Sequence, residues 1–549
     1  TLRDAHNMGH EKNRIAISEI INPKALTVDE IFGYMTLAKD WKDGVLSIMM
    51  RGMSKNDRDL GYKESQTMKW IIFDGDVDTY WIESMNTVMD ANKVLTLVSN
   101  ERIDLTPQMR VVCELDSLKN ASPATVSRNG LLYINESDIG WRPAVDIWLK
   151  TREDKNETNF LPALFDKYIE ATQFMSKSNG LIEISPVRIL TKANAATAIV
   201  ARLLEQMTAE QKTQEALEQV FLFACIWGFG GPLCDDRTNE NRTKFDECFQ
   251  SQWKEALQAQ YPKDTSVFDY YYNPKEEDWV AWEDDVTPYE YQPIGWGPGQ
   301  TDFSYIYVTY SDTVKNEKIL QYLVEHEQPI CLVGLAGTGK TAAVQKFLAA
   351  QDPEFMLNSA IDVNFYTEHR NIQAEIENVI DKRSGRVFGP PPGKKMLYFL
   401  DDLNLPEIEE FGTQNALSML RMIMDLKTFY DREDLSFRKE IVDAVYVASM
   451  NPTAGSFHVA DRVQRHFAVL ACDIPSEAES KSVYLQILDG HLQGMDFASN
   501  IASHVEKIVD ATIFLHKTVL DKFLPGAIKF MYIWNLRELA NIVRGLCRA

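Results

Sequence analysis

The stretch Pro329-Ile-Cys-Leu-Val-Gly-Leu-Ala-Gly-Thr-Gly-Lys-Thr341 decides the fold class of this chain. Its apolar start leads directly into the pattern Gly334-x-x-x-x-Gly339-Lys340-Thr341, and apolar residues at helical spacing follow from Ala342. A strand, a glycine-rich loop and a helix in this order are the context in which such a pattern binds phosphate. The sequence therefore predicts an α/β domain with a parallel sheet and a phosphate-binding loop, or P-loop.

The P-loop residues suit ATP or ADP together with Mg²⁺. Glycines let backbone N–H groups turn inward around the phosphates, and the start of the following helix favours an anion. Lys340 supplies a positive charge for the β- and γ-phosphates, and the Thr341 hydroxyl is placed to bind Mg²⁺. The predicted nucleotide-binding loop comprises Gly334, Leu335, Ala336, Gly337, Thr338, Gly339, Lys340 and Thr341.

Two further apolar strands end in polar residues. Met396-Leu-Tyr-Phe-Leu-Asp401 is followed by Asp402, which is the Walker B pattern. In that pattern the first carboxylate holds Mg²⁺ and the second polarises the attacking water. The strand 444–450 is followed by Asn451, which we interpret as a sensor of the γ-phosphate, although an Asn before Pro is also a common turn opener.

Two arginines complete the predicted site. Arg465 follows Asn451 by 14 residues, and Arg537 stands at the start of a predicted helix near the end of the chain. A single arginine is more often part of a surface ion pair. Their spacing after the strands favours a role in contacting nucleotide.

The first half of the chain repeats this arrangement of strands and arginine. The apolar run Trp70-Ile-Ile-Phe-Asp74 again ends in Asp, the strand 109–114 follows, and Arg128 closes the series. The interval from Asp74 to Arg128 is 54 residues, against 64 from Asp401 to Arg465, which predicts two tandem copies of one module. No glycine loop precedes the first copy near position 13, so that the loop either lies before residue 1 or has been lost.

Composition restricts the class of protein. The 549 residues include 57 Lys+Arg and 80 Asp+Glu, a net charge of −23, and 45% are hydrophobic. A strongly acidic chain is a poor partner for nucleic acid or an anionic membrane, and no apolar run approaches the length of a membrane span. The seven scattered cysteines form no zinc pattern and suggest reduced thiols, so we expect a soluble intracellular protein.

The sequence also resembles a known family over essentially its whole length. The segments Asn22-Pro-Lys-Ala25, Trp41-Lys-Asp-Gly44 and Ala124-Thr-Val-Ser-Arg128 look like the second AAA+ module of an axonemal dynein heavy chain of the outer-arm β type. The P-loop, Phe399-Leu-Asp-Asp-Leu-Asn-Leu-Pro406 and Asn535-Leu-Arg537 are similar to the third module.

The resemblance implies two P-loop NTPase-type sheet domains, each followed by a small helical domain. We expect a truncated second-module sheet domain at 1–143, its helical domain at 144–262 and an extended acidic, aromatic connection at 263–303. The third-module sheet domain then covers 304–475 and its helical domain 476–549. The P-loop of the second module would lie just before residue 1, which makes the chain a middle piece of a motor ring.

The resemblance further implies roles for single residues. Arg128 and Arg465 match the arginine fingers that each module presents to its neighbour's nucleotide. Gly75 stands where a catalytic Glu would follow Asp74, and Asp402 is one methylene shorter than Glu. These departures imply regulatory ATP or ADP sites with weak or absent hydrolysis.

The expected partners are the remaining dynein modules in cis, other dynein chains, and microtubules through a stalk outside this chain. The expected location is the cytoskeleton of the cilium or flagellum. The two alternatives are a catalytically competent tandem AAA+ remodelling ATPase, in which Asp402 is the general base, and a scaffold with a purely structural nucleotide.

Overall fold

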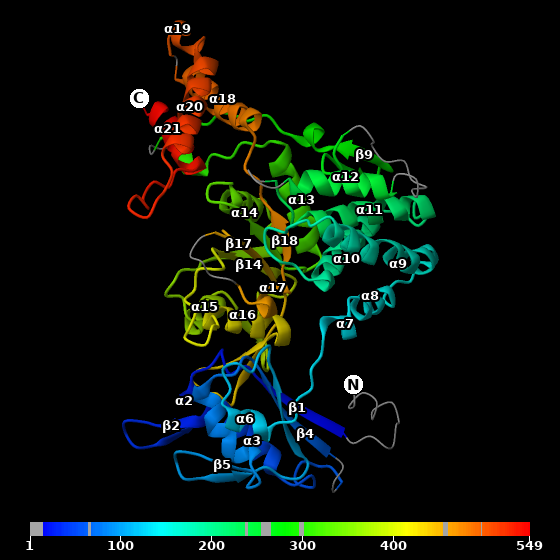
Figure 1. Cartoon of the computed structure of the whole chain (residues 1–549), viewed down its shortest axis with the longest axis vertical. Coiled ribbons are helices and arrows are strands. Elements are labelled where there is room, and N and C mark those ends of the chain that lie inside the picture. Colours follow the sequence, from blue (N-terminus) through cyan, green and yellow to red (C-terminus); the bar gives the residue numbers. More distant parts are fainter. Residues whose placement is uncertain are drawn as a thin grey trace.

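The computed structural model describes residues 15–63, 67–235, 240–253, 265–295, 301–453, 459–495 and 497–548. Residue 1, the predicted start of the first domain, and position 13, near which the spacing would place a glycine loop, therefore lie outside the described residues. The chain forms two sheet subdomains, one in its first half and one in its second half, and two groups of helices (Figure 1).

The second half of the chain contains a five-stranded parallel sheet, here called the C-terminal sheet subdomain. Its strands lie in the order β11-β14-β17-β10-β18. Their bounds are β10 (Ile330–Val333), β11 (Met356–Asp362), β14 (Lys395–Asp401), β17 (Ala444–Met450) and β18 (Ala468–Ala471). The P-loop strand β10 therefore lies between β17 and β18, and the carboxyl ends of β10, β14 and β17 meet at one edge.

Helices cover both faces of this sheet. Along β14, Leu397 and Phe399 pack on one face and Met396, Tyr398 and Leu400 on the other, as the alternation of side chains in a strand requires. One face is covered by α13 (Ser311–Glu325) and α14 (Lys340–Ala349), and the other by α15 (His369–Glu377) and α16 (Asn415–Leu426). Burial on both faces explains why the inner strands β10, β14 and β17 are nearly continuous apolar runs.

A smaller four-stranded sheet extends from this subdomain toward the first half of the chain. It contains β12 (Asp381–Ser384), β13 (Val387–Gly389), β16 (Arg438–Ile441) and β15 (Thr428–Tyr430), in that order. The short helix α17 (Asp461–Gln464) follows β17.

The first half of the chain begins with a three-stranded parallel sheet, here called the N-terminal sheet subdomain. Its order is β1 (Ile15–Ile21), β4 (Thr67–Asp74), β7 (Met109–Glu114). The order matches β11-β14-β17, with Asp74 ending β4 as Asp401 ends β14. The predicted internal repeat therefore has a structural counterpart in three neighbouring strands.

Short helices and two hairpins surround this sheet and close its core around Phe73 and Trp81. The helices are α2 (Val28–Phe32), α3 (Val45–Ser54), α4 (Thr79–Ile82), α5 (Asn86–Met89) and α6 (Pro123–Arg128), with a 3₁₀ turn at Glu83–Met85. The hairpins are β2 (Gly33–Met35) with β3 (Trp41–Asp43), and β5 (Val94–Thr96) with β6 (Arg102–Asp104).

A helical group, the N-terminal lid, follows an irregular connection after Arg128. It contains α7 (Glu136–Ile139), α8 (Arg142–Leu149), α9 (Lys155–Ser178), α10 (Ile189–Glu205), α11 (Gln214–Gly230) and α12 (Asn241–Trp253). The buried side chains of α10 and α11 belong to the same apolar core as Leu332 and Phe399 of the C-terminal sheet. The N-terminal lid therefore packs as one unit with the module that follows it, as Figure 1 shows (cyan and green helices beside the sheet).

The predicted extended connection at 263–303 contains more regular structure than the sequence suggested. A hairpin of β8 (Tyr270–Asn273) and β9 (Asp278–Ala281) is followed by a 3₁₀ turn at Trp282–Asp285. Trp282 is fully buried against Phe223 and Trp227 of α11. Phe268, Tyr271, Tyr272 and Trp282 thus complete the core of the N-terminal lid.

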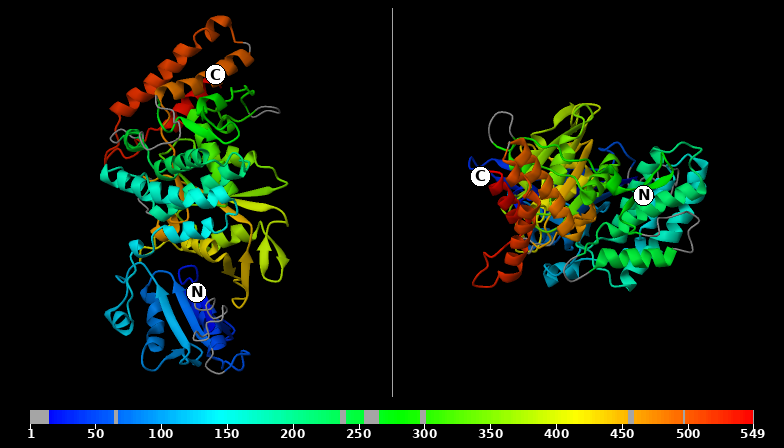
Figure 2. Two further views of the ribbon diagram at one scale, coloured as in Figure 1. Left: turned by 90° about the vertical axis from the view of Figure 1, so that its right-hand side faces the viewer. Right: turned by 90° about the horizontal axis from the view of Figure 1, so that it is seen from above.

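The chain ends in a second helical group, the C-terminal lid, which lies at the opposite end of the molecule from the N-terminal sheet subdomain (Figure 2). It contains α18 (Glu477–Gly494), α19 (Ser499–Ala502), α20 (Val505–Lys522) and α21 (Leu536–Leu546). A 3₁₀ turn at Phe303–Tyr305 precedes α13 in the sequence, and Phe303 packs against this lid. Its core includes Ile487, Val509 and Leu539. None of the described helices is long and apolar enough to cross a membrane.

Candidate nucleotide site

The P-loop runs from the end of β10 to the start of α14. Gly337 and Gly339 have φ of 88° and 80°, which L-residues with a side chain rarely adopt. A Cβ at Gly337 would lie 3.0 Å from Cβ of Leu536 and 3.2 Å from the backbone nitrogen of Arg537. The first turn of α21 in the C-terminal lid therefore lies directly on the loop.

Lys340 is held inside the loop that it serves. Its Nζ donates to the carbonyl oxygens of Gly334 and Leu335, each at 2.8 Å, and the residue is only 8% exposed. Burial holds the pKa of Lys340 below its ordinary value, although the nearby carboxylates of Asp402 and Asp401 act in the opposite direction. The ammonium group thus lies among carbonyl oxygens and acids, and it supplies the positive charge that a phosphate at this loop would require.

The two predicted magnesium ligands lie side by side. Thr341 Oγ1 donates to Asp401, at 2.9 Å from Oδ2 and 3.2 Å from Oδ1. Ser449 of β17 also donates from its hydroxyl to Asp401 Oδ1. Carboxylate and hydroxyl oxygens are hard ligands that Mg²⁺ accepts as part of a shell completed by water and phosphate. The residues present therefore fit the metal, which would link Thr341 and Asp401 to the nucleotide.

Asp402 occupies an unusual backbone position next to this pair. Its φ is 57°, in the left-handed region, and its N–H donates to Asp401 Oδ1 at 3.2 Å. Burial and the charge of Asp401 raise the pKa of Asp402. The left-handed backbone of Asp402, together with a side chain one methylene shorter than that of Glu, therefore sets where the predicted second Walker B carboxylate lies.

Asn451 uses its side chain within its own turn. Its Oδ1 accepts hydrogen bonds from the backbone and hydroxyl of Thr453, and its carbonyl accepts from Asn404 Nδ2 at 2.9 Å. Both interpretations of this residue, turn opener and sensor, are compatible with its place at the end of β17. Its sensor role stays a prediction.

A cavity of about 440 Å³ opens beside the P-loop, between the C-terminal sheet subdomain and the C-terminal lid. Ile306, Val308, Ile487 and Leu536 form apolar walls, and the lid contributes Arg537. The charge of Arg537 acts on the pKa of both Lys340 and Asp402. The structure therefore brings Lys340, Thr341, Asp401, Asp402 and Arg537 together, and their roles toward a nucleotide stay predictions.

Asp473 is an additional acid in this cavity. It pairs with Arg242 of the N-terminal lid, and burial raises the pKa of Asp473 to about 6 in spite of the arginine's charge. The preceding module's lid thus supplies a cation that pairs with one acid of the cavity wall.

The corresponding acid of the N-terminal sheet subdomain, Asp74, is engaged across the boundary between the two modules. Arg421 of α16 donates from Nη1 to both carboxylate oxygens of Asp74, at 2.9 and 2.8 Å. Arg462 of α17 also contacts Asp74 and lies 3.2 Å from Glu114 Oε1. Asp74 is therefore contacted by two arginines, and the one that comes from the segment of the predicted finger Arg465 is Arg462, three residues before it.

Gly75, next to Asp74, has no space for a side chain. A Cβ there would lie 2.9 Å from Asn22 Oδ1 and 2.9 Å from Pro23 Cδ. Real Cβ atoms essentially never approach other heavy atoms so closely. The position at which a catalytic glutamate would stand is thus filled by the Asn22–Pro23 turn.

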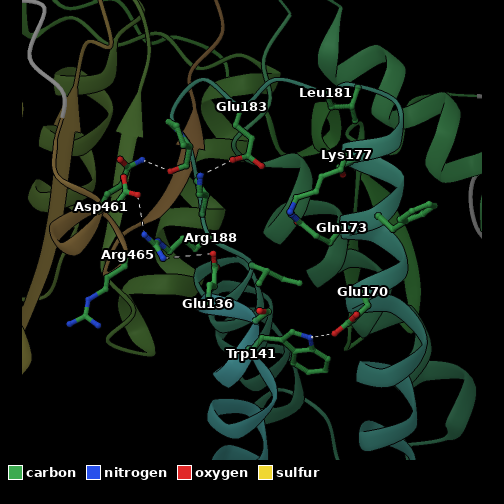
Figure 3. A pocket seen from close by; sticks show the side chains of 18 of the residues that line it. Glu136, Trp141, Glu170, Gln173, Lys177, Leu181, Glu183, Arg188, Asp461 and Arg465 are labelled. Atoms are coloured by element: carbon green, nitrogen blue, oxygen red, sulfur yellow. Dashed lines mark hydrogen bonds and ion pairs between the residues drawn. The ribbon is translucent and has the colours of Figure 1, made fainter. Parts of the chain in front are cut away.

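Arg465 and Arg128 lie elsewhere. Arg465 pairs with Asp425 at 2.8 Å. It also lines a cavity of about 1130 Å³ between the N-terminal lid and α17 (Figure 3). Across this cavity Arg188 pairs with Asp461 at 3.1 Å. Arg128 pairs with Asp90 within its own subdomain. The finger roles of Arg465 and Arg128 stay predictions.

Sequence reasoning missed three site residues, Ser449, Arg421 and Arg462. Ser449 lies two residues before Asn451, so strand alternation could have placed both on one side of β17. Arg462 lies in the same short segment as Arg465, and spacing alone does not choose between them. No local signal marks Arg421, whose partner Asp74 is 347 residues away.

Comparison with known proteins agrees with this architecture. Residues 297–475 match the family model described as the P-loop containing dynein motor region, and residues 161–284 match the dynein heavy chain AAA lid domain. Residues 13–129 match the AAA domain of the dynein-related subfamily, and residues 508–549 match an AAA+ lid domain. These matches confirm the predicted α/β P-loop AAA+ fold with helical lid domains.

Similar proteins align along nearly the whole chain. The dynein beta chain of the flagellar outer arm of Chlamydomonas reinhardtii is 38% identical over 553 residues, covering 100% of this chain and 12% of that protein. Dynein axonemal heavy chain 9 of Homo sapiens is 37% identical, covering 99% and 12%, and the ciliary dynein beta chain of Tripneustes gratilla is 39% identical, covering 96% and 11%. The chain therefore spans about an eighth of the length of these relatives. It belongs to the dynein heavy-chain family, and it corresponds to part of the AAA+ motor region of an axonemal, outer-arm β-type heavy chain.

Proposed function

We propose that the chain is the regulatory nucleotide-binding part of a dynein motor ring, formed by its second and third AAA+ modules. It binds ATP or ADP with Mg²⁺ at the P-loop of the C-terminal module and hydrolyses it slowly or not at all. The nucleotide state of this region contributes to ATP-driven, microtubule-based motility in the cilium or flagellum.

The observation that carries this proposal is the state of the two Walker B positions. Gly75 offers no carboxylate after Asp74, and the neighbouring turn leaves no space for one. Asp402 does offer a carboxylate, on a side chain one methylene shorter than Glu and on a left-handed backbone. Because a misplacement of about 1 Å can cost roughly 10²-fold in rate, both positions favour binding over turnover.

Neighbouring modules would act on these sites through arginines. Arg128 would serve the site of the preceding module, where such a finger contributes about 10³–10⁵ in rate. Arg465 would serve the nucleotide of the N-terminal module, and the contact of Arg462, three residues before it, with Asp74 supports this assignment. The proposed partners are the other ring modules in cis, other dynein chains, and microtubules through a stalk outside this chain.

The test measures binding and turnover on the same preparation. Calorimetric titration of the chain with Mg–ADP and Mg–ATP is expected to show binding that the Lys340→Ala variant loses, because Lys340 holds the loop and faces the phosphates. Steady-state ATP turnover is expected to stay far below the typical enzyme rate of about 10 per second. Turnover at that rate by the wild-type chain would refute the regulatory role.

The Asp402→Asn variant separates this proposal from a competent remodelling ATPase. A working general base at this position would make turnover fall by about 10²–10⁴-fold on substitution. Equal residual turnover in the wild type and in Asp402→Asn would exclude that alternative. Exchange of bound nucleotide within seconds would likewise exclude a purely structural nucleotide.

A further inference from the structure

One continuous segment, residues 402–421, joins the nucleotide site of the C-terminal module to the Walker B acid of the N-terminal module. It begins at Asp402 beside the P-loop and ends at Arg421 on α16. Between these ends it contacts the N-terminal sheet subdomain at several points.

The first part of the segment is bonded to the strands of the nucleotide site. Leu403 N–H donates to the carbonyl of Ser449 at 2.9 Å, and the Ser449 hydroxyl donates to Asp401. Asn404 Nδ2 donates to the carbonyl of Asn451 at 2.9 Å. A ligand that changes the partners of Asp401 therefore acts directly on the first residues of the segment.

The middle of the segment is attached to the other module. Glu409 forms an ion pair with Lys24, a residue only 4% exposed that also pairs with Asp78. Asn120 Nδ2 donates to the carbonyl of Phe411 at 3.0 Å. These contacts prevent the segment from moving independently of the N-terminal sheet subdomain.

The last part of the segment carries the contact with Asp74. Asn22 Nδ2 donates to the carbonyl of Ser418 at 3.0 Å, next to the turn that fills the space beside Gly75. The Arg421 side chain is 3% exposed and binds both carboxylate oxygens of Asp74. Its Nη2 donates to the backbone carbonyl of Asp74 as well. A buried guanidinium that holds both the carboxylate and the backbone of one residue has a narrow geometry and transmits small displacements of its helix.

We propose that residues 402–421 couple the nucleotide occupancy of the C-terminal module to the position of Asp74 in the N-terminal module, with Arg421 as the residue that transmits the change. This inference rests on the proposed nucleotide binding at the P-loop. Coupling between two sites is reciprocal, so breaking the Arg421–Asp74 contact is expected to change the affinity of the P-loop site.

The test measures the dissociation constant of Mg–ADP by calorimetry in four forms of the chain: wild type, Arg421→Met, Asp74→Asn and the double variant. Each single variant is expected to change the dissociation constant by at least about fivefold, the lower end of typical coupling. Since both remove one contact, the two changes have the same direction and the double variant adds little to either.

Two further variants make the outcome decisive. Arg51→Met is the matched control. Among the described residues Arg51 pairs within its own subdomain, with Asp43 and Glu101, so its loss should leave the affinity unchanged. Glu409→Gln changes a partly exposed side chain and should shift the affinity in the same direction as Arg421→Met, even if the buried variants fold poorly.

Hydrogen exchange gives a second readout. Mg–ADP is expected to change the exchange of the amides at residues 70–76 in the wild type and in Arg51→Met, but not in Arg421→Met. If the wild type binds Mg–ADP, and Arg421→Met and Glu409→Gln have the same affinity and the same hydrogen-exchange response as the wild type, the coupling alone is overturned. Absence of Mg–ADP binding to the wild type would overturn the proposed function itself.

Discussion

The close packing around Gly75 yields a prediction that can be measured without any ligand. Replacing Gly75 by Ala places a Cβ 2.9 Å from both Asn22 Oδ1 and Pro23 Cδ. Asn22 is 1% exposed and cannot move freely, because its Oδ1 accepts from the Lys24 N–H and its Nδ2 donates to Ser418, each at 3.0 Å. Overpacking of this kind typically costs about 1–3 kcal/mol, and a lost hydrogen bond adds about 0.5–1.5 kcal/mol.

The matched control is Gly52→Ala in helix α3 of the same subdomain. A Cβ at Gly52 meets no atom within 4 Å, and Ala is favoured over Gly inside a helix by roughly 0.5–1 kcal/mol. The two Gly-to-Ala changes should therefore have opposite signs, although their chemistry is identical.

The appropriate assay is native-state hydrogen exchange of the β4 amides, which reports the opening free energy of this subdomain rather than of the whole chain. We expect Gly75→Ala to lower that free energy and Gly52→Ala to maintain or raise it. Equal protection of β4 in Gly75→Ala and in the wild type would refute the argument that the Asn22–Pro23 turn excludes a side chain. Such a result would mean that position 75 has space for a side chain, and a glutamate at that position would then be possible.

Three other predictions concern pH and the shared core. Burial and then the charge of Arg432 lower the pKa of His369 from 6.5 to about 4. The free energy of unfolding should therefore decrease by up to roughly 3 kcal/mol as the pH falls from 6.5 to 4. Urea unfolding should show this decrease in the wild type and not in His369→Phe. Burial alone would raise the pKa of Asp425, but His466, Arg465 and Arg421 bring it to about 2. Stability present above pH 4 should therefore be lost by roughly 2 kcal/mol toward pH 2, and acid titration of Asp425→Asn should lack this loss. Trp282→Ala should reduce the free energy of unfolding by about 3–5 kcal/mol and lower the denaturation midpoints of the N-terminal lid and the C-terminal sheet together. A lower midpoint for only one of the two would contradict their common core.

The two interfaces of the N-terminal module differ in chemistry. Its lid shares an apolar core with the C-terminal sheet subdomain, whereas its sheet subdomain is attached largely by ion pairs. Acids of the N-terminal side face bases of the C-terminal side in the pairs Glu19–Arg438, Glu30–Arg432, Asp74–Arg421 and Glu114–Arg462. Polar interfaces between domains permit relative motion more readily than large apolar ones. The sheet subdomain is therefore the part of the module best suited to move when a ligand binds.

Much of the candidate site could be predicted because its signals are local. The P-loop, the strand that ends in Asp401 and the strand that ends before Asn451 are recognised from short runs of residue types. Parallel strands bring their carboxyl ends to one edge, which places Lys340, Thr341 and Asp401 together once the strand order is known. Arg537 followed from its place at the start of a helix.

The amino-acid sequence by itself determined the fold class, the internal repeat and the P-loop, since each depends on residues close together in the chain and on the periods of strand and helix. Only the tertiary structure decided that Arg462 and Arg421 meet Asp74, that the Asn22–Pro23 turn fills the space at Gly75, and that Trp282 closes the lid core. These contacts join residues as far as 388 positions apart. Long-range pairing depends on how whole subdomains pack, and no local period or spacing in the sequence records that packing.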